Sequence, residues 1–223
     1  MSDYGTMQSR IADELGRADL TDQIKKAIQS AIKKYERQRF YFNTTTATFS
    51  TVPGQEYYGA SDLADIPNIV QFDAVEIDLD GVSRPLGQRD VAFTNDINSI
   101  AGFMADPEYF TYYQQQIRLA PVPSLARTVK LSYVYRLPAL SENEDTNAWM
   151  TDAEELIRMR AKCDLFVNVI RDVSAQEIAL CREYERDALA DLLRETALRM
   201  SSGKLRTETE LTARSSFLIV RGY

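Results

Sequence analysis

The chain has 223 residues, of which 44% are hydrophobic and 26% charged, enough for a sizeable core in one or two domains. It contains no histidine, which excludes nucleophiles activated by histidine and every histidine-ligated metal site. The formal net charge is −7, and residues 44–150 carry 14 acidic but only 6 basic side chains, so tight binding to nucleic-acid phosphates is not expected.

Residues 6–16 are predicted to form a short helix. At helical spacing, Met7 and Ile11 fall on one face. Thr6 is the expected N-cap, and Gly16 suits the left-handed position that follows many helices.

A longer helix is predicted over residues 19–42, with Thr21 and Asp22 as its N-terminal signal. Lysine and glutamate alternate with apolar positions, which indicates one buried and one solvated face. The apolar stripe consists of Ile24, Ala27, Ile28, Ala31, Ile32 and Tyr35.

Near residue 44 the hydrophobic period changes from about 3.6 residues to 2, which is typical of strands. Pro53-Gly54 and Asp80-Gly81 are turn dipeptides, the second being a strong hairpin signal. The predicted elements are strand, turn and strand over 44–58, a hairpin over 68–86, a short helix over 89–100, and three further strands within 107–123 and 126–140.

The helical period returns after residue 148. Thr151 with Glu154, and Ser174 with Glu177, have the spacing of capping boxes at the start of two long helices. The predicted stripes are Leu156, Met159, Cys163, Phe166 and Ile170 in the first helix, and Ile178, Cys181, Tyr184 or Glu185, Ala188 and Leu192 in the second.

These elements predict an α+β fold. Amphipathic helices from both ends of the chain need each other to bury their apolar stripes, so we expect one four-helix bundle with the β-rich insert as a separate lobe. The expected divisions are the N-terminal helices at 1–43, the β-rich insert at 44–148, two long helices at 149–202, and an extended C-terminal arm at 203–223.

A dense run of carboxylates is the best candidate for chemistry, because two-metal phosphoryl transfer uses such groups. A loop and the first turn of a helix explain them more simply, since negative charge is stabilised at a helix N-terminus. The "DLDG" at 78–81 lacks the later ligands of a calcium loop. We therefore expect no catalytic residue, no cofactor and no metal. The carboxylates are Glu142, Glu144, Asp145, Asp152, Glu154 and Glu155.

Other conspicuous residues have structural interpretations. Cys163 and Cys181 are expected to be small buried side chains. Trp149 is expected to pack onto the following helix, with an interface anchor as the alternative. The basic stretch "KKAIQSAIKKYERQR" is expected to be a solvated helix face rather than a phosphate-binding one.

The C-terminal stretch "SFLIVRGY" is the most unusual feature of the sequence. It is apolar, has high strand propensity, and follows a polar stretch from residue 201 to 216. Folding back onto the chain's own sheet or bundle is one interpretation. An arm that adds to another subunit's sheet or groove is the other, and its length of about twenty residues favours a partner.

Four stretches together resemble the adaptor proteins of tailed bacteriophages, also called head-to-tail connector or head-completion subunits. The likeness covers most of residues 5–200 and depends on the order and spacing of the stretches rather than on a short motif. The stretches are "TFSTVPGQEYY", "LADIPNIVQFDAV", "QQIRLAPVPSLARTVKLSYV" and "RLPALSENEDTNAWMTDAEELIRMRAKCDLF".

The resemblance implies a structural protein that assembles as a twelve-subunit ring under the portal and lets DNA pass without specific binding. It also implies that the C-terminal arm contacts the portal and that the β-rich lobe contacts the tail nozzle or tail tube. The expected portal-binding residues are Phe217, Leu218, Ile219, Val220 and Tyr223, and we expect this arm to become ordered on docking. The expected tail-binding residues are Pro53, Gly54, Asp80 and Gly81.

Other functions stay open at this point. A tail-tube or tail-completion subunit would also assemble as a ring, but with different neighbouring proteins. A carboxylate-dependent nuclease acting during packaging and a regulator with a peptide-binding sheet edge are weaker alternatives. No window has the apolar length of a membrane span, and residues 1–10 do not resemble a signal peptide, so we expect synthesis in the host cytoplasm and incorporation into the virion.

Overall fold

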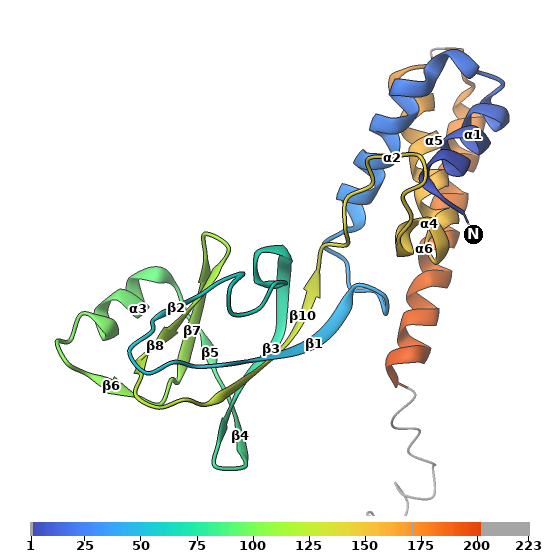
Figure 1. The fold of residues 1–223 in the computed structure, drawn as a ribbon. Coiled ribbons are helices and arrows are strands. Elements are labelled where there is room, and N and C mark those ends of the chain that lie inside the picture. Colours follow the sequence, from blue (N-terminus) through green and yellow to red (C-terminus); the bar gives the residue numbers. More distant parts are fainter. Residues whose placement is uncertain (1, 171, 202–223) are drawn as a thin grey trace, which may run out of the picture.

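The computed structural model describes residues 2–170 and 172–201. Most of its helices gather at one end and its strands at the other, and two chain crossings join the two parts (Figure 1). The mixture of helices and sheets agrees with the predicted α+β class.

The helical body has one hydrophobic core, to which helices from both ends of the chain contribute. Helix α5 is central, because it contacts α1, α2 and α6. Ile28, Ile157 and Leu192 show how three of these helices meet in the core. The elements are α1 (Tyr4–Leu15), the 3-10 turn η1 (Ala18–Leu20), α2 (Thr21–Tyr35), α4 (Ala148–Thr151), α5 (Glu154–Asn168) and α6 (Ala175–Ser201).

The predicted ends of the first two helices were partly wrong. The N-cap of α1 is Asp3, whose carboxylate accepts a hydrogen bond from the backbone N–H of Thr6, the predicted cap. Gly16 does take the left-handed conformation after α1, with φ of 62°. Helix α2 ends at Tyr35 rather than at residue 42, because the buried stripe ends there and Asn43 instead organises a turn by accepting from the N–H of Phe40.

One of the two predicted capping boxes is present. Ser174 and Glu177 exchange hydrogen bonds before α6, at 2.9 and 3.2 Å. The Thr151–Glu154 box is wrong, because Thr151 belongs to the short helix α4, which Asn147 caps instead. The residue before α5 is Ala153, which has no side-chain cap.

The predicted stripes of the long helices are partly confirmed. Cys163 and Cys181 are buried, as expected. In α6, Glu185 rather than Tyr184 occupies the buried position. In α5, Met159 and Phe166 are only partly buried, because the face toward the core is formed by Leu156, Ile157, Ala161 and Leu165.

The strands form two four-stranded sheets and one small pair. The strand orders are β1-β10-β3-β4, β2-β8-β7-β5 and β6-β9. The elements are β1 (Thr44–Ser50), β2 (Tyr57–Tyr58), η2 (Ile66–Asn68), β3 (Ile69–Leu79), β4 (Val82–Pro85), β5 (Gly87–Gln88), α3 (Val91–Asn98), β6 (Met104–Ala105), β7 (Tyr109–Tyr113), β8 (Gln116–Ala120), β9 (Val122–Pro123) and β10 (Thr128–Tyr135).

The register of the first sheet explains its buried face. Leu131 on β10 lies between Ala47 on β1 and Val75 on β3, so these antiparallel strands turn one set of alternate side chains toward the core. The predicted hairpin is confirmed: β3 and β4 are joined at Asp80 and Gly81, which have φ of 55° and 88°. Positive φ at both positions matches the tight hairpin turn that this dipeptide favours.

The β lobe, which is the part formed by β1–β10 and α3, has its own hydrophobic core. Tyr58, Ile117 and Tyr133 are fully buried within it. Ion pairs hold the lobe to the helical body: Arg39 binds Asp73, and the guanidinium of Arg136 lies 3.4 Å from the Glu36 carboxylate. These ion pairs lie near the end of α2, where the chain enters the lobe and where it returns to the helical body.

Candidate functional site

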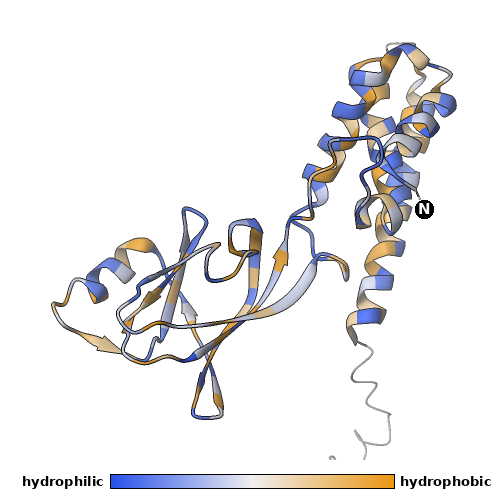
Figure 2. Cartoon of the chain, viewed as in Figure 1, coloured by the Kyte–Doolittle hydropathy of each residue, from blue (hydrophilic) through white to orange (hydrophobic). Residues whose placement is uncertain are grey.

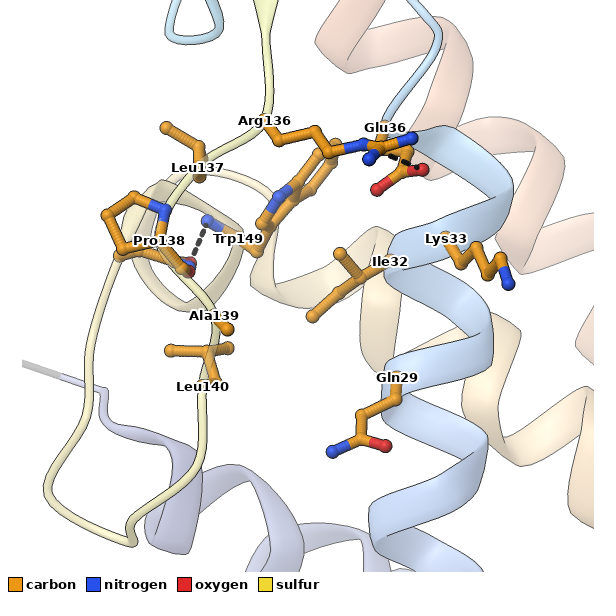
Figure 3. Close-up of a pocket in the computed structure, with 11 residues that line it drawn as sticks. Gln29, Ile32, Lys33, Glu36, Arg136, Leu137, Pro138, Ala139, Leu140 and Trp149 are labelled. Carbon is orange, nitrogen blue, oxygen red and sulfur yellow. Dashed lines mark hydrogen bonds and ion pairs between the residues drawn. The ribbon is translucent and has the colours of Figure 1, made fainter. Parts of the chain in front are cut away.

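A groove of about 410 Å³ lies between α2 and the chain that leaves β10 (Figure 3). Ile32 and Gln29 extend from α2 toward Leu140, and the ring of Trp149 lies behind the groove (Figure 3). The Arg136–Glu36 ion pair closes one end. Leu137, Pro138 and Ala139 complete an apolar wall.

Several backbone groups beside this groove have no hydrogen-bond partner within the described residues. The Pro138 carbonyl accepts a hydrogen bond from the Asn147 side chain at 2.8 Å. Within residues 2–170 and 172–201, the backbones of Leu137, Ala139 and Leu140 form no hydrogen bond. An apolar groove with free backbone groups is a surface for docking a protein segment.

A second exposed surface lies at the end of the lobe far from the helical body (Figure 1). Five large apolar side chains there are between 44 and 56% exposed, and we call them the distal patch. The pairing of β6 with β9, and a 2.9 Å hydrogen bond from the Gly54 N–H to the Pro123 carbonyl, hold its segments together. Hydrophobic positions are visible around α3 and β6 (Figure 2). The distal patch consists of Val52, Ile100, Phe103, Met104 and Leu125.

The structure links the two turns that the sequence singled out. Pro53-Gly54 adjoins the distal patch, since Val52 precedes it. The Arg127 guanidinium lies 2.5 Å from the carboxylate of Asp80 and 3.3 Å from that of Asp106, and its backbone N–H donates to the Thr51 hydroxyl at 2.8 Å. The ion pair with Asp80 therefore connects the hairpin turn to the strand ends beside the patch.

A buried polar network fixes the position of α3, which leads into the patch. The Arg118 guanidinium donates to Glu56 and to Asn95, and its side chain is only 9% exposed. The Asn98 amide donates to the Leu119 carbonyl at 2.9 Å. Because α3 is held to β8 in this way, the loop that carries Ile100 and Phe103 starts from a fixed base.

Three of the six carboxylates that suggested catalysis are engaged in other contacts. Asp145 accepts from the backbone N–H groups of Ser141 and Glu142, which lowers its pKa. Glu154 pairs with Arg10 at 3.2 Å. Asp152 accepts from the Tyr41 hydroxyl at 2.5 Å.

One small cavity does have an acidic lining. Asp152 and Glu155 share a 130 Å³ hollow with Asp191 and Glu195 between α5 and α6. Asp191 pairs with Arg194, which provides its counter-charge. Across the described residues, no group of three or more His, Cys, Asp or Glu side chains is placed to hold a metal ion.

Glu185 forms a buried polar centre where α2, α5 and α6 meet. Its carboxylate accepts from Tyr35 and from Lys34, the latter at 2.7 Å, and lies 3.6 Å from Arg160. Burial alone would raise the pKa of Glu185, but the hydrogen bonds and positive charges outweigh it and hold the pKa below its ordinary value. The nearby Cys163 thiol has a raised pKa because of its hydrogen bond with Cys181 and its burial.

The predicted portal-binding residues lie outside the described residues. They are Phe217, Leu218, Ile219, Val220 and Tyr223. The 203–223 division lies there as well, so both stay predictions.

The described surfaces are of the kind found on assembly subunits: one is a groove on the helical body, and the other is a set of exposed apolar side chains at the far end of the lobe. A comparison with protein families identifies the family to which the chain belongs. The chain belongs to the SU10 adaptor protein family, whose model matches residues 2–213. This is a family of phage head-tail adaptors, so the predicted resemblance is confirmed and the protein is a structural component of a phage virion.

No curated protein is similar enough to this chain to count as a match. Among the described helices, none combines the length and apolarity needed to cross a bilayer. The family match ends before Phe217, so the family adds nothing to the interpretation of the C-terminal apolar stretch.

Sequence reasoning missed the groove and the distal patch. The groove depends on Leu137–Leu140 leaving the sheet beside α2, where a continuing strand was expected. The patch draws on three separate segments, and its only sequence signal was the turn at Pro53-Gly54.

Proposed function

We propose that this chain joins the portal to the tail of a bacteriophage as a subunit of an adaptor ring. The helical body and the C-terminal stretch face the portal, and the lobe faces the tail nozzle or tail tube. The family membership supports the adaptor role. Twelve subunits is the number that the resemblance implies.

The distal patch is the observation that carries this proposal. Exposed apolar side chains gathered at one end are uncommon on proteins that act alone, and they mark protein interfaces. Their place at the end of the lobe opposite the helices gives the subunit two unlike ends, as a protein between two partners requires. Pro53, Gly54, Asp80 and Gly81 border this end and are the proposed contacts with the tail.

DNA passes through the ring without being held. Residues 44–150 carry an excess of acidic side chains, so a channel wall built from them would neutralise few phosphates. The absence of counterion release keeps the affinity for the duplex low. This leaves the genome free to move during ejection.

Deleting residues 208–223 is expected to stop attachment to the portal while leaving the fold intact. The deleted stretch includes the apolar residues 217–220, whereas both described cores are formed by residues up to Leu193, which the shortened protein keeps. Attachment is measured by incubating the purified full-length and shortened proteins with portal-bearing heads and analysing the heads by electron microscopy. Circular dichroism checks that the shortened protein is folded.

Normal binding of the shortened protein would disprove the portal role of the C-terminal stretch. Full-length protein located at the tail tip or within the tail tube would instead indicate the tail-completion alternative.

Replacing Leu125 by Asp is expected to block tail joining but not portal attachment. Leu125 is 53% exposed, so the charge costs less than about 0.5 kcal/mol of stability, yet it would be buried unpaired against the tail. The measurement counts tailed particles after tails are added to adaptor-bearing heads. Val167→Asp, at a similarly exposed aliphatic position on α5, is the matched control, and equal tail joining by wild type and Leu125→Asp contradicts the assignment.

A further inference from the structure

The exposed side of α6 carries an unpartnered stripe. Leu180 and Tyr184 are 47 and 51% exposed, and Asp187 follows them at helical spacing. Within the described residues Asp187 forms no ion pair, and no hydrogen bond or ring contact involves Tyr184. Tyrosine is one of the residues enriched at the anchor positions of protein interfaces.

The groove side of α2 has the opposite charge. Lys26, Lys33 and Arg37 are exposed, and within residues 2–170 and 172–201 none of them forms an ion pair. Lys33 lies at the rim of the groove, with its chain directed away from Leu140 (Figure 3). The groove lining combines apolar side chains such as Ile32 and Leu140 with Gln29 and the Arg136–Glu36 ion pair.

These two surfaces of one copy face different directions. Lys34 and Tyr35 reach α6 through Glu185, whereas Ile32 points into the groove. The groove is lined by residues of α2, of the segment that follows β10 and of the region around Trp149, and no described residue of α6 lines it. An α6 stripe that occupies this groove therefore comes from another molecule.

We propose that the groove is the site where a second copy of this chain docks, with Leu180 and Tyr184 of one copy entering the groove of the next. Asp187 then lies against Lys33 at the rim. The phenol hydroxyl of Tyr184 has the side chain of Gln29 and the free backbone of Ala139 as hydrogen-bonding partners. The contact joins two different surfaces, which is the kind of contact that builds a ring when the rotation between neighbours closes. This inference rests on the proposed function, for which it supplies the contact between neighbours.

Charge reversal on either side tests the contact. Lys33→Glu and Asp187→Lys are each expected to lower the number of copies bound per portal-bearing head at least about tenfold, because each places like charges together. Combining both substitutions restores an attractive pair and is expected to recover wild-type occupancy. Circular dichroism of each variant checks the fold. Wild-type occupancy by both single variants overturns the proposed contact.

A cross-link measures the contact directly. With Gln29→Cys and Tyr184→Cys in one chain, oxidation on portal-bearing heads is expected to give a ladder of covalent oligomers on a non-reducing gel. Either substitution alone is the control, since the native Cys163 and Cys181 are buried. Monomers alone from the double variant overturn the contact.

The outcomes distinguish a failure of the proposed function from a failure of the α2–α6 contact alone. Wild-type protein that never attaches to heads contradicts the proposed function and the ring contact with it. Wild-type protein that attaches as rings, together with variants that attach equally well and give no cross-link, contradicts only the α2–α6 contact.

Discussion

Replacing Trp149 by Ala is expected to destabilise the protein by about 3–5 kcal/mol. Trp149 is 2% exposed and packs edge-on against Phe40 and Phe42, with ring centroids 5.8 and 5.1 Å away. Removing the indole leaves a cavity between the end of α2 and the chain that re-enters the helical body. The loss of stability therefore has two parts: the apolar burial of the ring is lost, and the cavity left behind collapses only in part.

Urea unfolding followed by circular dichroism measures this loss, because the sequence has a single tryptophan and fluorescence would disappear with it. Tyr184→Ala is the matched control: it also truncates an aromatic ring, but one that is 51% exposed, and is expected to change stability by less than about 0.5 kcal/mol. Equal unfolding midpoints for Trp149→Ala and wild type would show that this aromatic cluster does not stabilise the fold.

Replacing Glu185 by Gln is expected to cost about 2 kcal/mol at pH 7. Removing one partner of a buried ion pair typically costs 3–5 kcal/mol, and we reduce this because the Lys34 and Arg160 side chains are 45 and 29% exposed. Glutamine keeps the shape of the side chain and a hydrogen-bond acceptor for Tyr35, so the difference reports mainly on charge.

The effect of Glu185→Gln depends on pH. The folded pKa of Glu185 is lowered from the ordinary 4.5, so its charge stabilises the fold fully above that value and loses this effect as the pH falls through the folded pKa. The stability difference between wild type and variant should therefore be constant from pH 7 to about 5.5 and shrink below pH 4.5. Urea unfolding at several pH values measures it.

Glu183→Gln is the control for this charge effect, since Glu183 is two residues away, 57% exposed, and expected to contribute less than about 0.5 kcal/mol. A difference between wild type and Glu185→Gln that stays constant down to pH 3 contradicts the assigned role of the carboxylate.

Local patterns in the sequence identified most of the secondary structure. The change in hydrophobic period near residue 44 located the strands, and Asp80-Gly81 located a hairpin turn that forms as predicted. The capping box at Ser174 predicted the start of α6. Each signal is encoded within a few neighbouring residues, because helix periodicity, turn conformation and capping depend on local geometry.

Predictions failed where a local signal competed with tertiary contacts. The helical pattern of residues 19–42 continues past Tyr35, but Phe40 and Phe42 pack against Trp149, which is more than a hundred residues away in the sequence. The Thr151–Glu154 spacing fits a capping box, yet Glu154 pairs with Arg10 of α1 instead.

By itself, the sequence determined the α+β class, the order of the elements and the resemblance to phage adaptors, because periodicity and the succession of motifs are properties of the chain as written. Only the tertiary structure decided which residues share a surface. The groove needs Leu137–Leu140 to run beside α2, and the distal patch needs Val52, Met104 and Leu125 to meet at one end of the lobe. Docking surfaces depend on such long-range placement, which no short stretch of sequence encodes.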